Sequence, residues 1–353
     1  MPGLVERSAL LRREQDVHTG HAGQPADWMV VGGDLGGTST RVLVAGKDGL
    51  PLGRGTAGGG NPVSHPGTAA AALGQAMAHA LAGLEPALVR AAVIGVAGGS
   101  ALSRPEVRDA FDRVWADLGM GCLPRYASDL EIAFAAGTSE PDGTILIAGT
   151  GAVAGAVRNR QLIQTVDGHG WLLGDDGSGF WLGREAARAT LRTLDAGEEP
   201  GPLVRSVLRE LAALDEPTAL SQRPDLSWQR VRVIDTVNSR PAVRLAELAP
   251  LVTAACAEND HVAKRIVEQA ARLLLETVCR VRRPEERTPI VLAGGLTDKE
   301  SPVGARLRDL VDQRLSGPVR SVLDGVGGAA WLALSEVDPA AATVQARLRL
   351  ALT

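Results

Sequence analysis

The chain has 353 residues, 45% of them hydrophobic and 22% charged, which is typical of a folded globular protein with room for two domains. A net charge of −4 provides no basic surface for nucleic acid, and no apolar run approaches the roughly 18 residues of a membrane span. These features predict a cytoplasmic protein with a small-molecule partner. The three cysteines lie far apart without a C-x-x-C pattern, so we expect neither disulfides nor a zinc site.

The first part of the chain predicts a tail followed by an α/β unit. Residues 1–27 are polar and lack the apolar core of a signal peptide, so we expect a flexible tail. Three strand-like runs should then form antiparallel hairpins: WMVVGGD, TRVLVAG and PLGRGTAG. A helix that Pro66 is placed to start, the buried strand RAAVIGV, an amphipathic helix, the strand LPRYASD and the helix LEIAFAAG follow. This unit is predicted to cover residues 28–140.

The same order begins again at Gly143, which indicates an internal duplication at the level of pattern. GTILIAGTGAVAGAVRNRQLIQTV contains three strand-like runs, the first two joined by a Gly-Thr-Gly turn. A mostly helical region follows, in which Glu198 to Arg244 should be a helical insertion with loops, and TPIVLAGGLT supplies another buried strand and glycine turn. We therefore predict two similar α/β domains with a cleft between them, the second over residues 141–353. Its last helix can pack back on the first domain.

Two glycine-rich turns lie between strands, in GGDLGGTSTRVLV and ILIAGTGAV. Such turns can direct several backbone N–H groups at phosphate oxygens, although neither ends in the Lys-Ser or Lys-Thr of the usual phosphate loop. The second turn also imitates a dinucleotide-binding turn, with Asp167 at a suitable distance for a ribose contact. A dinucleotide fold needs a helix after the glycines, however, and the residues here favour a hairpin. A dinucleotide-dependent oxidoreductase is the competing class.

The two turns resemble the phosphate loops of the actin, hexokinase and Hsp70 ATPase superfamily. Five further motifs extend the resemblance to the BadF/BadG/BcrA/BcrD ATPase group, and more narrowly to its N-acetylglucosamine kinases: GGGNPVSH, ASDLEIAFAAG, GHGWLLGDDGSGFWLG, VLAGGLTD and DGVGGAAWLAL. It covers about Met29 to Glu336. The resemblance implies two actin-like (ribonuclease H-like) domains and transfer of phosphate from ATP, with Mg²⁺, to the 6-hydroxyl of N-acetylglucosamine or a related amino sugar. It is also compatible with a homodimer.

The resemblance assigns the nucleotide to three turns and the metal to Asp34, whose carboxylate would hold Mg²⁺, through water. The first two turns would hold the γ- and β-phosphates, and the third would lie on the adenosine side. Their residues are Gly36, Gly37, Thr38 and Ser39; Gly149, Thr150 and Gly151; and Gly294 and Gly295. On the residues alone, Asp34 can also be a plain turn aspartate, and the glycines can serve tight turns without a ligand.

The sugar site is likewise implied by the resemblance. Asp129 would be the base that takes the proton of the sugar hydroxyl, although Ser128 or Asp129 can instead cap the following helix. Asn61 would contact the sugar, whereas an Asn before Pro is more often a turn residue. The other expected sugar contacts are Ala152, Val153, Gly168, His169 and Asp175, with Asp175 accepting hydrogen bonds from two hydroxyls. Trp171 is expected in the core.

One segment departs from the family pattern. The vertebrate-type members have GGWGH before Gly-Asp-Glu-Gly-Ser, whereas this chain has DGHGW and then Gly-Asp-Asp-Gly-Ser, which exchanges the aromatic and histidine positions. The shape of the acetamido pocket is therefore open, and so are other acceptors: a hexose, a muramic-type sugar or a cyclitol. A non-catalytic nucleotide- or sugar-binding regulator on the same fold would keep the phosphate turns but not need the base.

Overall fold

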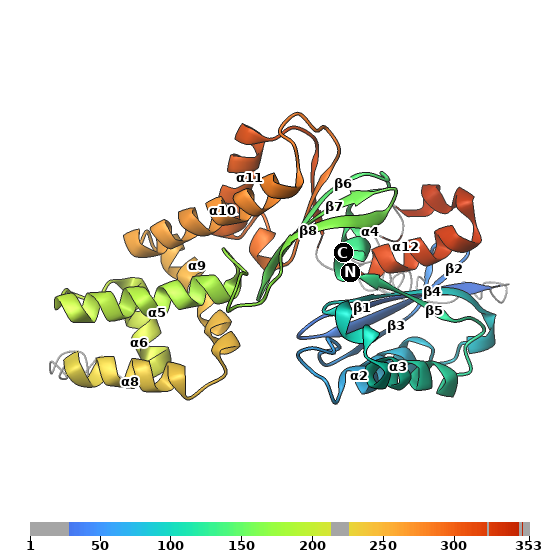
Figure 1. Ribbon diagram of the computed structural model, residues 1–353, viewed down its shortest axis with the longest axis horizontal. Helices are drawn as coiled ribbons and strands as arrows, with labels where there is room; N and C mark the ends of the chain where they lie inside the picture. Colours follow the sequence, from blue (N-terminus) through green and yellow to red (C-terminus); the bar gives the residue numbers. More distant parts are fainter. Residues whose placement is uncertain (1–27, 213–225, 323–324, 346–347, 349–353) are drawn as a thin grey trace, which may run out of the picture.

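The computed structural model describes residues 28–212, 226–322, 325–345 and 348. The predicted tail, 1–27, lies outside the described residues. Two five-stranded sheets form the centres of two α/β domains, and a group of helices extends from the second one (Figure 1). The predicted fold class, α/β with two domains of similar topology, is confirmed.

The first sheet has the strand order β3-β2-β1-β4-β5. As predicted, the first three strands form antiparallel hairpins, and β4 and β5 run parallel to β1. The strands are β1 (Met29–Leu35), β2 (Thr40–Gly46), β3 (Pro51–Ala57), β4 (Val89–Val96) and β5 (Pro124–Ser128). Because β1, β4 and β5 are parallel and in register, their carboxyl ends at Leu35, Val96 and Ser128 lie at one edge of the sheet.

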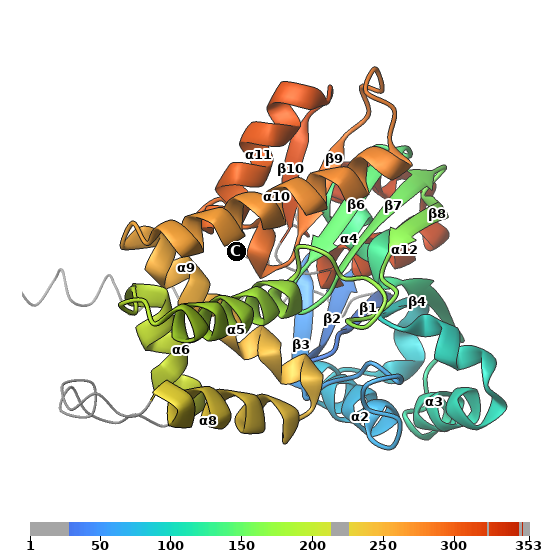
Figure 2. The ribbon, with the colours of Figure 1, turned by 60° about the vertical axis from the view of Figure 1, so that its left-hand side comes forward.

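Helices α2 (Ala69–Ala80) and α3 (Pro105–Asp117) cover one face of this sheet (Figure 2). The expected helix start at Pro66 is wrong, because α2 begins at Ala69. The N–H groups of Thr68 and Ala69 both donate to the carbonyl of His65, so a separate turn precedes the helix. Short 3-10 turns η1 (Pro86–Leu88) and η2 (Gly99–Ser103) flank β4.

The second sheet repeats the order of the first, as β8-β7-β6-β9-β10. Its strands are β6 (Gly143–Ala148), β7 (Ala152–Arg158), β8 (Gln161–Asp167), β9 (Ile290–Ala293) and β10 (Val319–Val322). The Gly-Thr-Gly turn is followed by the antiparallel strand β7 and not by a helix, which excludes the dinucleotide fold and supports the predicted duplication. Strand β10 is not among the predicted elements, because its four residues VRSV are at most partly buried and carry no apolar run.

Most helices of the second domain lie on one face of its sheet and beyond it. They are α5 (Gly179–Ala196), α6 (Pro202–Ala212), α8 (Leu226–Asn238), α9 (Ala249–Ala257), α10 (His261–Val281) and α11 (Pro302–Arg314), with the 3-10 turns η3 (Ala242–Leu248) and η4 (Gly295–Thr297). The expected helical insertion corresponds to α6 and α8, with 213–225 outside the described residues. A single large apolar cluster joins these helices to β6, β7 and β9.

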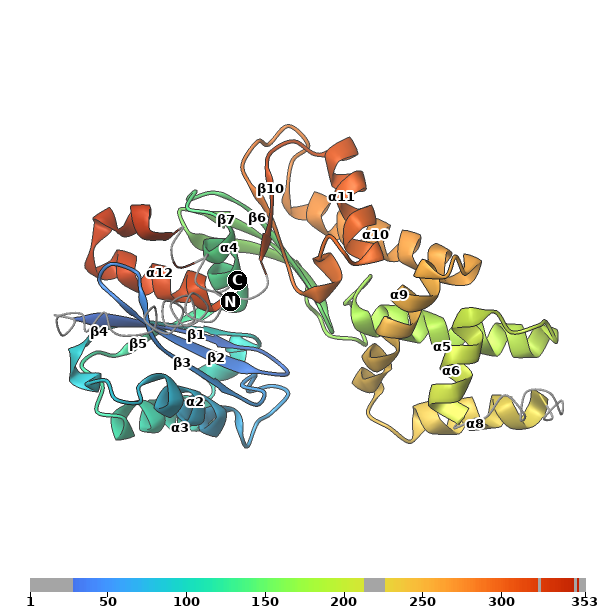
Figure 3. The same cartoon turned by 180° about the vertical axis from the view of Figure 1, so that it is seen from behind.

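Helices α4 (Asp129–Gly137) and α12 (Val326–Val337) lie between the two sheets (Figure 3). Ile132 of α4 packs with α12 and the first sheet, whereas Phe134 packs with β6, β7 and β9 of the second. A Cβ at Gly328 would collide with the carbonyl oxygen of Ile132, so glycine permits this close approach of the helices. The last element of the described residues is η5 (Pro339–Val344), which follows α12 after that helix has packed on the first sheet.

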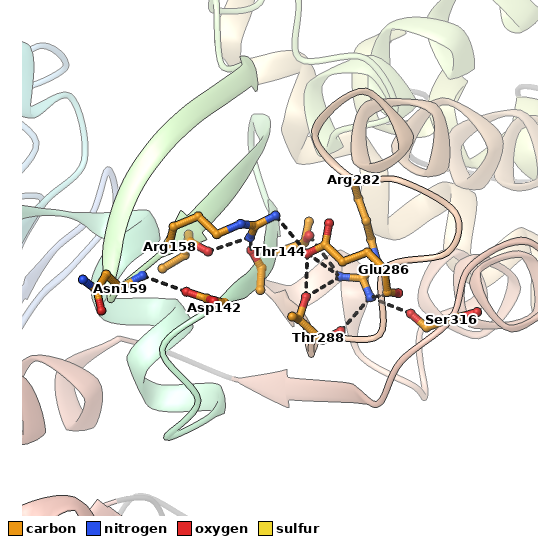
Figure 4. Close-up of polar contacts among 10 residues, drawn as sticks. Asp142, Thr144, Arg158, Asn159, Arg282, Glu286, Thr288 and Ser316 are labelled. Atoms are coloured by element: carbon orange, nitrogen blue, oxygen red, sulfur yellow. Dashed lines mark hydrogen bonds and ion pairs between the residues drawn. The ribbon is translucent and has the colours of Figure 1, made fainter.

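A polar network closes the end of the second sheet opposite the glycine turn (Figure 4). The buried guanidinium of Arg282 donates to the hydroxyl of Thr144 at 3.2 Å and to the carbonyls of Glu286, Thr288 and Ser316 at 2.5–2.7 Å. These hydrogen bonds replace the water that the charge loses on burial. We therefore assign the network a structural role.

Three further observations cover the cysteines, membrane-spanning helices and metal-ligand clusters, and they apply to the described residues alone. All three cysteines are free and half-buried. Within the described ranges, no helix is both long and apolar enough to span a bilayer. The same ranges contain no group of three or more His, Cys, Asp or Glu side chains arranged to hold a metal ion.

Candidate active site

The first glycine turn connects β1 to β2 and is closed by a hydrogen bond of 2.9 Å from the N–H of Gly36 to the carbonyl of Ser39. Gly37 and Thr38 at its tip are exposed. The carbonyl of Gly36 also accepts hydrogen bonds from the N–H groups of Gly60 and Asn61, at 3.0 and 3.1 Å. The turn expected to hold phosphate and the loop expected to hold sugar are therefore directly joined.

His65 is a second link between this turn and the Asn61 loop, and sequence reasoning missed it. Its Nε2 atom lies 2.7 Å from the carbonyl oxygen of Gly37, while its backbone N–H donates to the carbonyl of Asn61 at 2.8 Å. A Cβ at Gly59 would collide with the imidazole, so glycine is required beside it. The only sequence signal was the position of His65 in GGGNPVSH.

Asn61 is a turn residue, as an Asn before Pro often is, and the NH2 group of its side chain can still donate to a ligand. Its Oδ1 atom accepts hydrogen bonds from the N–H groups of Val63 at 2.8 Å and Ser64 at 3.3 Å, as in an Asx turn. This fixes the orientation of the side chain. Its amide group is then the part that can donate to a ligand.

The second glycine turn, Gly149–Gly151, is held by the start of α5. The N–H of Gly149 donates to the carbonyl of Gly151 at 2.9 Å, and the N–H groups of Gly179 and Phe180 donate to the carbonyls of Gly149 and Thr150 at 2.8 and 3.0 Å. Thr150 is exposed at the tip. The amino-terminal end of α5, which carries the positive end of the helix dipole, therefore lies directly behind this turn.

Asp175 packs against the same turn. Its Oδ1 atom accepts a hydrogen bond of 3.1 Å from the N–H of Ala152, and a Cβ at Gly151 would come within 2.8 Å of that oxygen. Burial is the main cause that raises the pKa of the Asp175 carboxyl, and the charge of Asp167 raises it further, against the N–H of Ala152 and the charge of His169, which lower it. Asp175 therefore joins the expected sugar residue Ala152, which Val153 follows in β7, to the phosphate turn.

Asp167 orients the backbone at Asp175. Its carboxylate is used for this and is not positioned to bind a ribose. Its two carboxylate oxygens accept hydrogen bonds from the N–H groups of Asp175 at 2.7 Å and Asp176 at 3.1 Å. Both Asp167 and Asp175 have positive φ, 67° and 59°, a conformation that Asp tolerates better than most residues. The carboxylate of Asp167 therefore holds a strained loop in shape.

The loop between β8 and α5 carries Gly168 and His169, both exposed, and the N–H of Gly168 donates to the carbonyl of Ala152 at 3.0 Å. The expected core position of Trp171 is wrong. Its side chain is 42% exposed and contacts the ring of Phe180 at a centroid distance of 5.6 Å. The glycine turn that begins at Gly170 carries Trp171 away from the core. An aromatic surface thus lies on the loop of His169 and Asp175.

Asp129 is the first residue of α4, directly after β5. Ser128 is the N-cap, and its hydroxyl accepts from the N–H of Leu130 at 3.1 Å. The Oδ1 atom of Asp129 accepts from the same N–H at 3.0 Å and from the Ser128 hydroxyl at 3.3 Å. Burial raises the pKa of the Asp129 carboxyl, and these hydrogen bonds oppose the rise. A half-buried, oriented carboxylate with a raised pKa is suited to proton abstraction.

Asp34 lies next to the end of β1, at the sheet edge that Asp129 shares. Its Oδ2 atom accepts a hydrogen bond of 2.9 Å from the N–H of Gly325 at the start of α12. The described residues offer no cluster of three ligands, so this carboxylate alone cannot form an all-protein cage. One carboxylate does fit Mg²⁺, which commonly keeps several waters and binds substrate phosphates.

The third glycine turn follows β9 and adjoins the second. Gly294 has a φ of 90°, and a Cβ there would collide with the carbonyl of Ala148, the residue before Gly149. The hydroxyl of Thr297 donates to the carbonyl of Gly294 at 2.9 Å and holds the turn. Gly295 faces open space. The predicted nucleotide residues of the second domain therefore lie at one edge of its sheet.

Comparison with known proteins links this arrangement to sugar kinases. Residues 31–333 match the BadF/BadG/BcrA/BcrD ATPase family. The N-acetylmuramic acid/N-acetylglucosamine kinase of Clostridium acetobutylicum is 27% identical over 253 residues, which are 69% of this chain and 77% of that protein.

Solved structures agree on the fold. A crystal structure from Chromobacterium violaceum, assigned as an N-acetylglucosamine kinase, superposes with a TM-score of 0.67 at 25% identity, and covers 88% of this chain and 100% of that one. A ROK family glucokinase from Streptomyces griseus, solved with glucose and AMPPNP, superposes with a TM-score of 0.53 at 18% identity, and covers 86% and 99% of the two chains. At 18% identity, the similarity to the glucokinase shows a common fold and nothing more.

Proposed function

Because the chain belongs to the BadF/BadG/BcrA/BcrD ATPase family, we propose that it is an ATP-dependent kinase of N-acetylglucosamine or a related amino sugar. The observation that carries this proposal is the position of Asp129. Its half-buried carboxyl, with a raised pKa, lies at the sheet edge that also bears Asp34 and the turn Gly36–Ser39. A regulator would need the turns but not this carboxylate.

The nucleotide is assigned to the three turns and the metal to Asp34. N–H and hydroxyl groups of Gly36–Ser39 would bind the γ-phosphate, those of Gly149–Gly151 the β-phosphate, and Gly294 and Gly295 would adjoin the adenosine. Mg²⁺, when bound, would neutralise charge on the phosphates. The exposure of Gly37, Thr38 and Thr150 at the turn tips supports this assignment.

Asp129 is assigned as the base. It would take the proton of the sugar hydroxyl, with the 6-hydroxyl as the proposed target, while the oxygen forms a bond to the γ-phosphorus and the bond to the β-phosphate oxygen breaks, so that ADP leaves. Asn61 and Asp175 would hold sugar hydroxyls, and Ala152, Val153, Gly168 and His169 would line the sugar. Closure of the two domains would exclude water as a competing acceptor.

The proposed domains are 28–140 and 141–353, with α12 of the second packed on the first. We also propose a cytoplasmic location, Mg²⁺ as cofactor and a homodimer as the assembly. A muramic-type sugar is the second candidate acceptor, because a relative at 27% identity is named for both N-acetylmuramic acid and N-acetylglucosamine.

The test is ATP consumption with Mg²⁺ on N-acetylglucosamine, glucosamine, N-acetylmuramic acid, glucose and a cyclitol, with the phosphate position read by NMR. Selective turnover of an N-acetylated sugar is expected. Turnover of an unacetylated compound alone would retain the mechanism and change the substrate. Binding of ATP without turnover of any acceptor would contradict the kinase and favour a regulator.

A further inference from the structure

Glu131 is the one charged residue of α4 besides Asp129, and its two carboxylate oxygens reach different parts of the fold. One oxygen lies at the corner between β5 and α4, and the other reaches the second sheet. The residue is half-buried, and its neighbours Leu130 and Ile132 are buried.

The first contact completes a capping box. The Oε2 atom of Glu131 accepts a hydrogen bond of 2.9 Å from the N–H of Ser128, while the Ser128 hydroxyl accepts from the N–H of Leu130. The same hydroxyl and the same N–H contact the Oδ1 atom of Asp129. Glu131 thus supports the two groups that orient the proposed base.

The second contact crosses between the domains. The Oε1 atom of Glu131 accepts a hydrogen bond of 3.3 Å from the N–H of Leu162 in β8. Since β8 is the edge strand of the second sheet, its outward N–H groups have no further strand to pair with. The pairing of β7 with β8 also shifts register at Val157, which is opposite Leu162.

Apolar side chains of α4 pack against both sheets around the hydrogen bond between Glu131 and Leu162. Ile132 and Ala135 face the first sheet and α12, whereas Leu130, Ala133 and Phe134 face the second sheet. Apolar contacts alone allow packed helices and sheets to slide by small distances. A carboxylate bonded on both sides fixes the position of the β5–α4 corner relative to β8 directly.

We propose that Glu131 is a positioning residue that ties the corner bearing Asp129 to the second domain. Leu162 is opposite Val157, near the end of β7 that is remote from the turn Gly149–Gly151, so the link acts on the β-phosphate site through the length of β7. The inference rests on the proposed kinase function, since it concerns the alignment of the two reacting groups of that site.

Two substitutions test the link at different strengths. Glu131→Gln retains the shape but offers one carbonyl oxygen, so it can accept from Ser128 or from Leu162 but not from both. Glu131→Ala removes both contacts. We expect kcat to fall about 10-fold in the first variant and about 100-fold in the second, as for small misplacements of a catalytic group. The KM values for sugar and ATP should change by less than about threefold, because substrate contacts are retained.

Arg160→Ala is the matched control. Arg160 lies in the turn between β7 and β8, two residues before Leu162, and also contacts the first domain, since its guanidinium donates to the carbonyl of Ser139 at 3.1 Å. The same guanidinium lies 5.1 Å from the ring centroid of Trp331 in α12, the helix packed on the first sheet. It does not contact the β5–α4 corner. Loss of this contact should lower the melting temperature and leave kcat near the wild-type value.

Hydrogen exchange of the full chain provides a readout that does not require turnover. In Glu131→Ala, the amides of Ser128 and Leu162 should exchange faster, while those of the inner strands β1 and β6 should stay protected. Unchanged exchange at these two amides would overturn the link, and an unchanged kcat in a folded Glu131→Ala protein would overturn the positioning role. If the wild-type chain phosphorylated none of the acceptors, the proposed function would fail, and exchange alone would decide whether the link exists.

Discussion

The carboxylate of Asp34 on β1 accepts a hydrogen bond of 2.9 Å from the backbone N–H of Gly325, which lies 291 residues later in the chain. Gly325 is the N-cap of α12, the helix that packs on the first sheet. A Cβ at Gly325 would lie about 2.5 Å from the side chain of Ile132 in α4. The start of α12 is therefore held between α4 and the proposed metal ligand.

Asp34→Asn should weaken the response to Mg²⁺. The neutral carboxamide is a poorer ligand for a hard cation, so the Mg²⁺ concentration for half-maximal turnover should rise on the order of 10-fold. Asp48→Asn is the control, because Asp48 lies in the β2–β3 turn, where it accepts from the N–H of Leu50 at 3.1 Å. Titration of turnover with Mg²⁺ measures both. An unchanged metal response in Asp34→Asn would remove the assignment.

Asp129→Asn should abolish transfer while binding persists. The amide retains the shape but cannot take a proton, so kcat should fall by about 10²- to 10⁴-fold. Calorimetric titration should give near wild-type affinities for sugar and ATP. Substantial turnover in this variant would exclude Asp129 as the base.

The raised pKa of Asp129 also predicts how stability depends on pH. Since burial raises the pKa in the folded state, this carboxyl stabilises the fold fully below its unfolded pKa, and the contribution is lost as pH rises through the folded pKa. Asn at this position does not ionise. Asp129→Asn should therefore melt above the wild type at neutral pH, and the difference should vanish in acid. Melting curves over a pH series measure this, and a wild type that is more stable at neutral pH would contradict it.

Asp167→Asn should raise the KM for sugar by about 10-fold, because the amide has a single, neutral acceptor oxygen, so one of the two N–H groups of Asp175 and Asp176 would lose its acceptor. Asn tolerates the positive φ of 67° at this position, so the backbone itself should not be strained. Asp176→Asn, on the exposed neighbour, is the control and should leave the KM unchanged. Steady-state kinetics with each substrate varied separates the effects. An equal rise in the KM for ATP would indicate general unfolding of the loop instead.

Gly328→Ala should destabilise the fold by about 1–3 kcal/mol, because the added methyl group meets backbone atoms of Ile132 and Ala136 that cannot move without separating α12 from α4. Gly74→Ala in α2 is the control. A Cβ there would be 3.3 Å from the side chain of Val114, and alanine should gain up to about 1 kcal/mol in a helix. Denaturant unfolding measures both free energies. Equal stabilities of the two variants would contradict the close packing.

The duplicated order of strands and turns could be predicted from the amino-acid sequence. Alternating and buried apolar runs bounded by glycines specify hairpins locally, so the three-stranded meander and the hairpin after Gly149 could be predicted without tertiary contacts. For the same reason, the sequence predicts that a strand ends and a helix begins at Asp129. β10 was not, because a short, partly buried strand is defined by its neighbour β9 and not by its own residues.

The pairing of polar groups depends on how the elements pack, and it could not be predicted from the sequence. The contacts of His65 with Gly37, Asp34 with Gly325 and Glu131 with Leu162 join residues 28 to 291 positions apart, and no local periodicity records such pairs. Trp171 was expected in the core because a tryptophan is usually buried, but its place on a glycine-rich loop exposes it. Local propensity therefore fixed the elements, whereas their packing fixed the partners of each polar side chain.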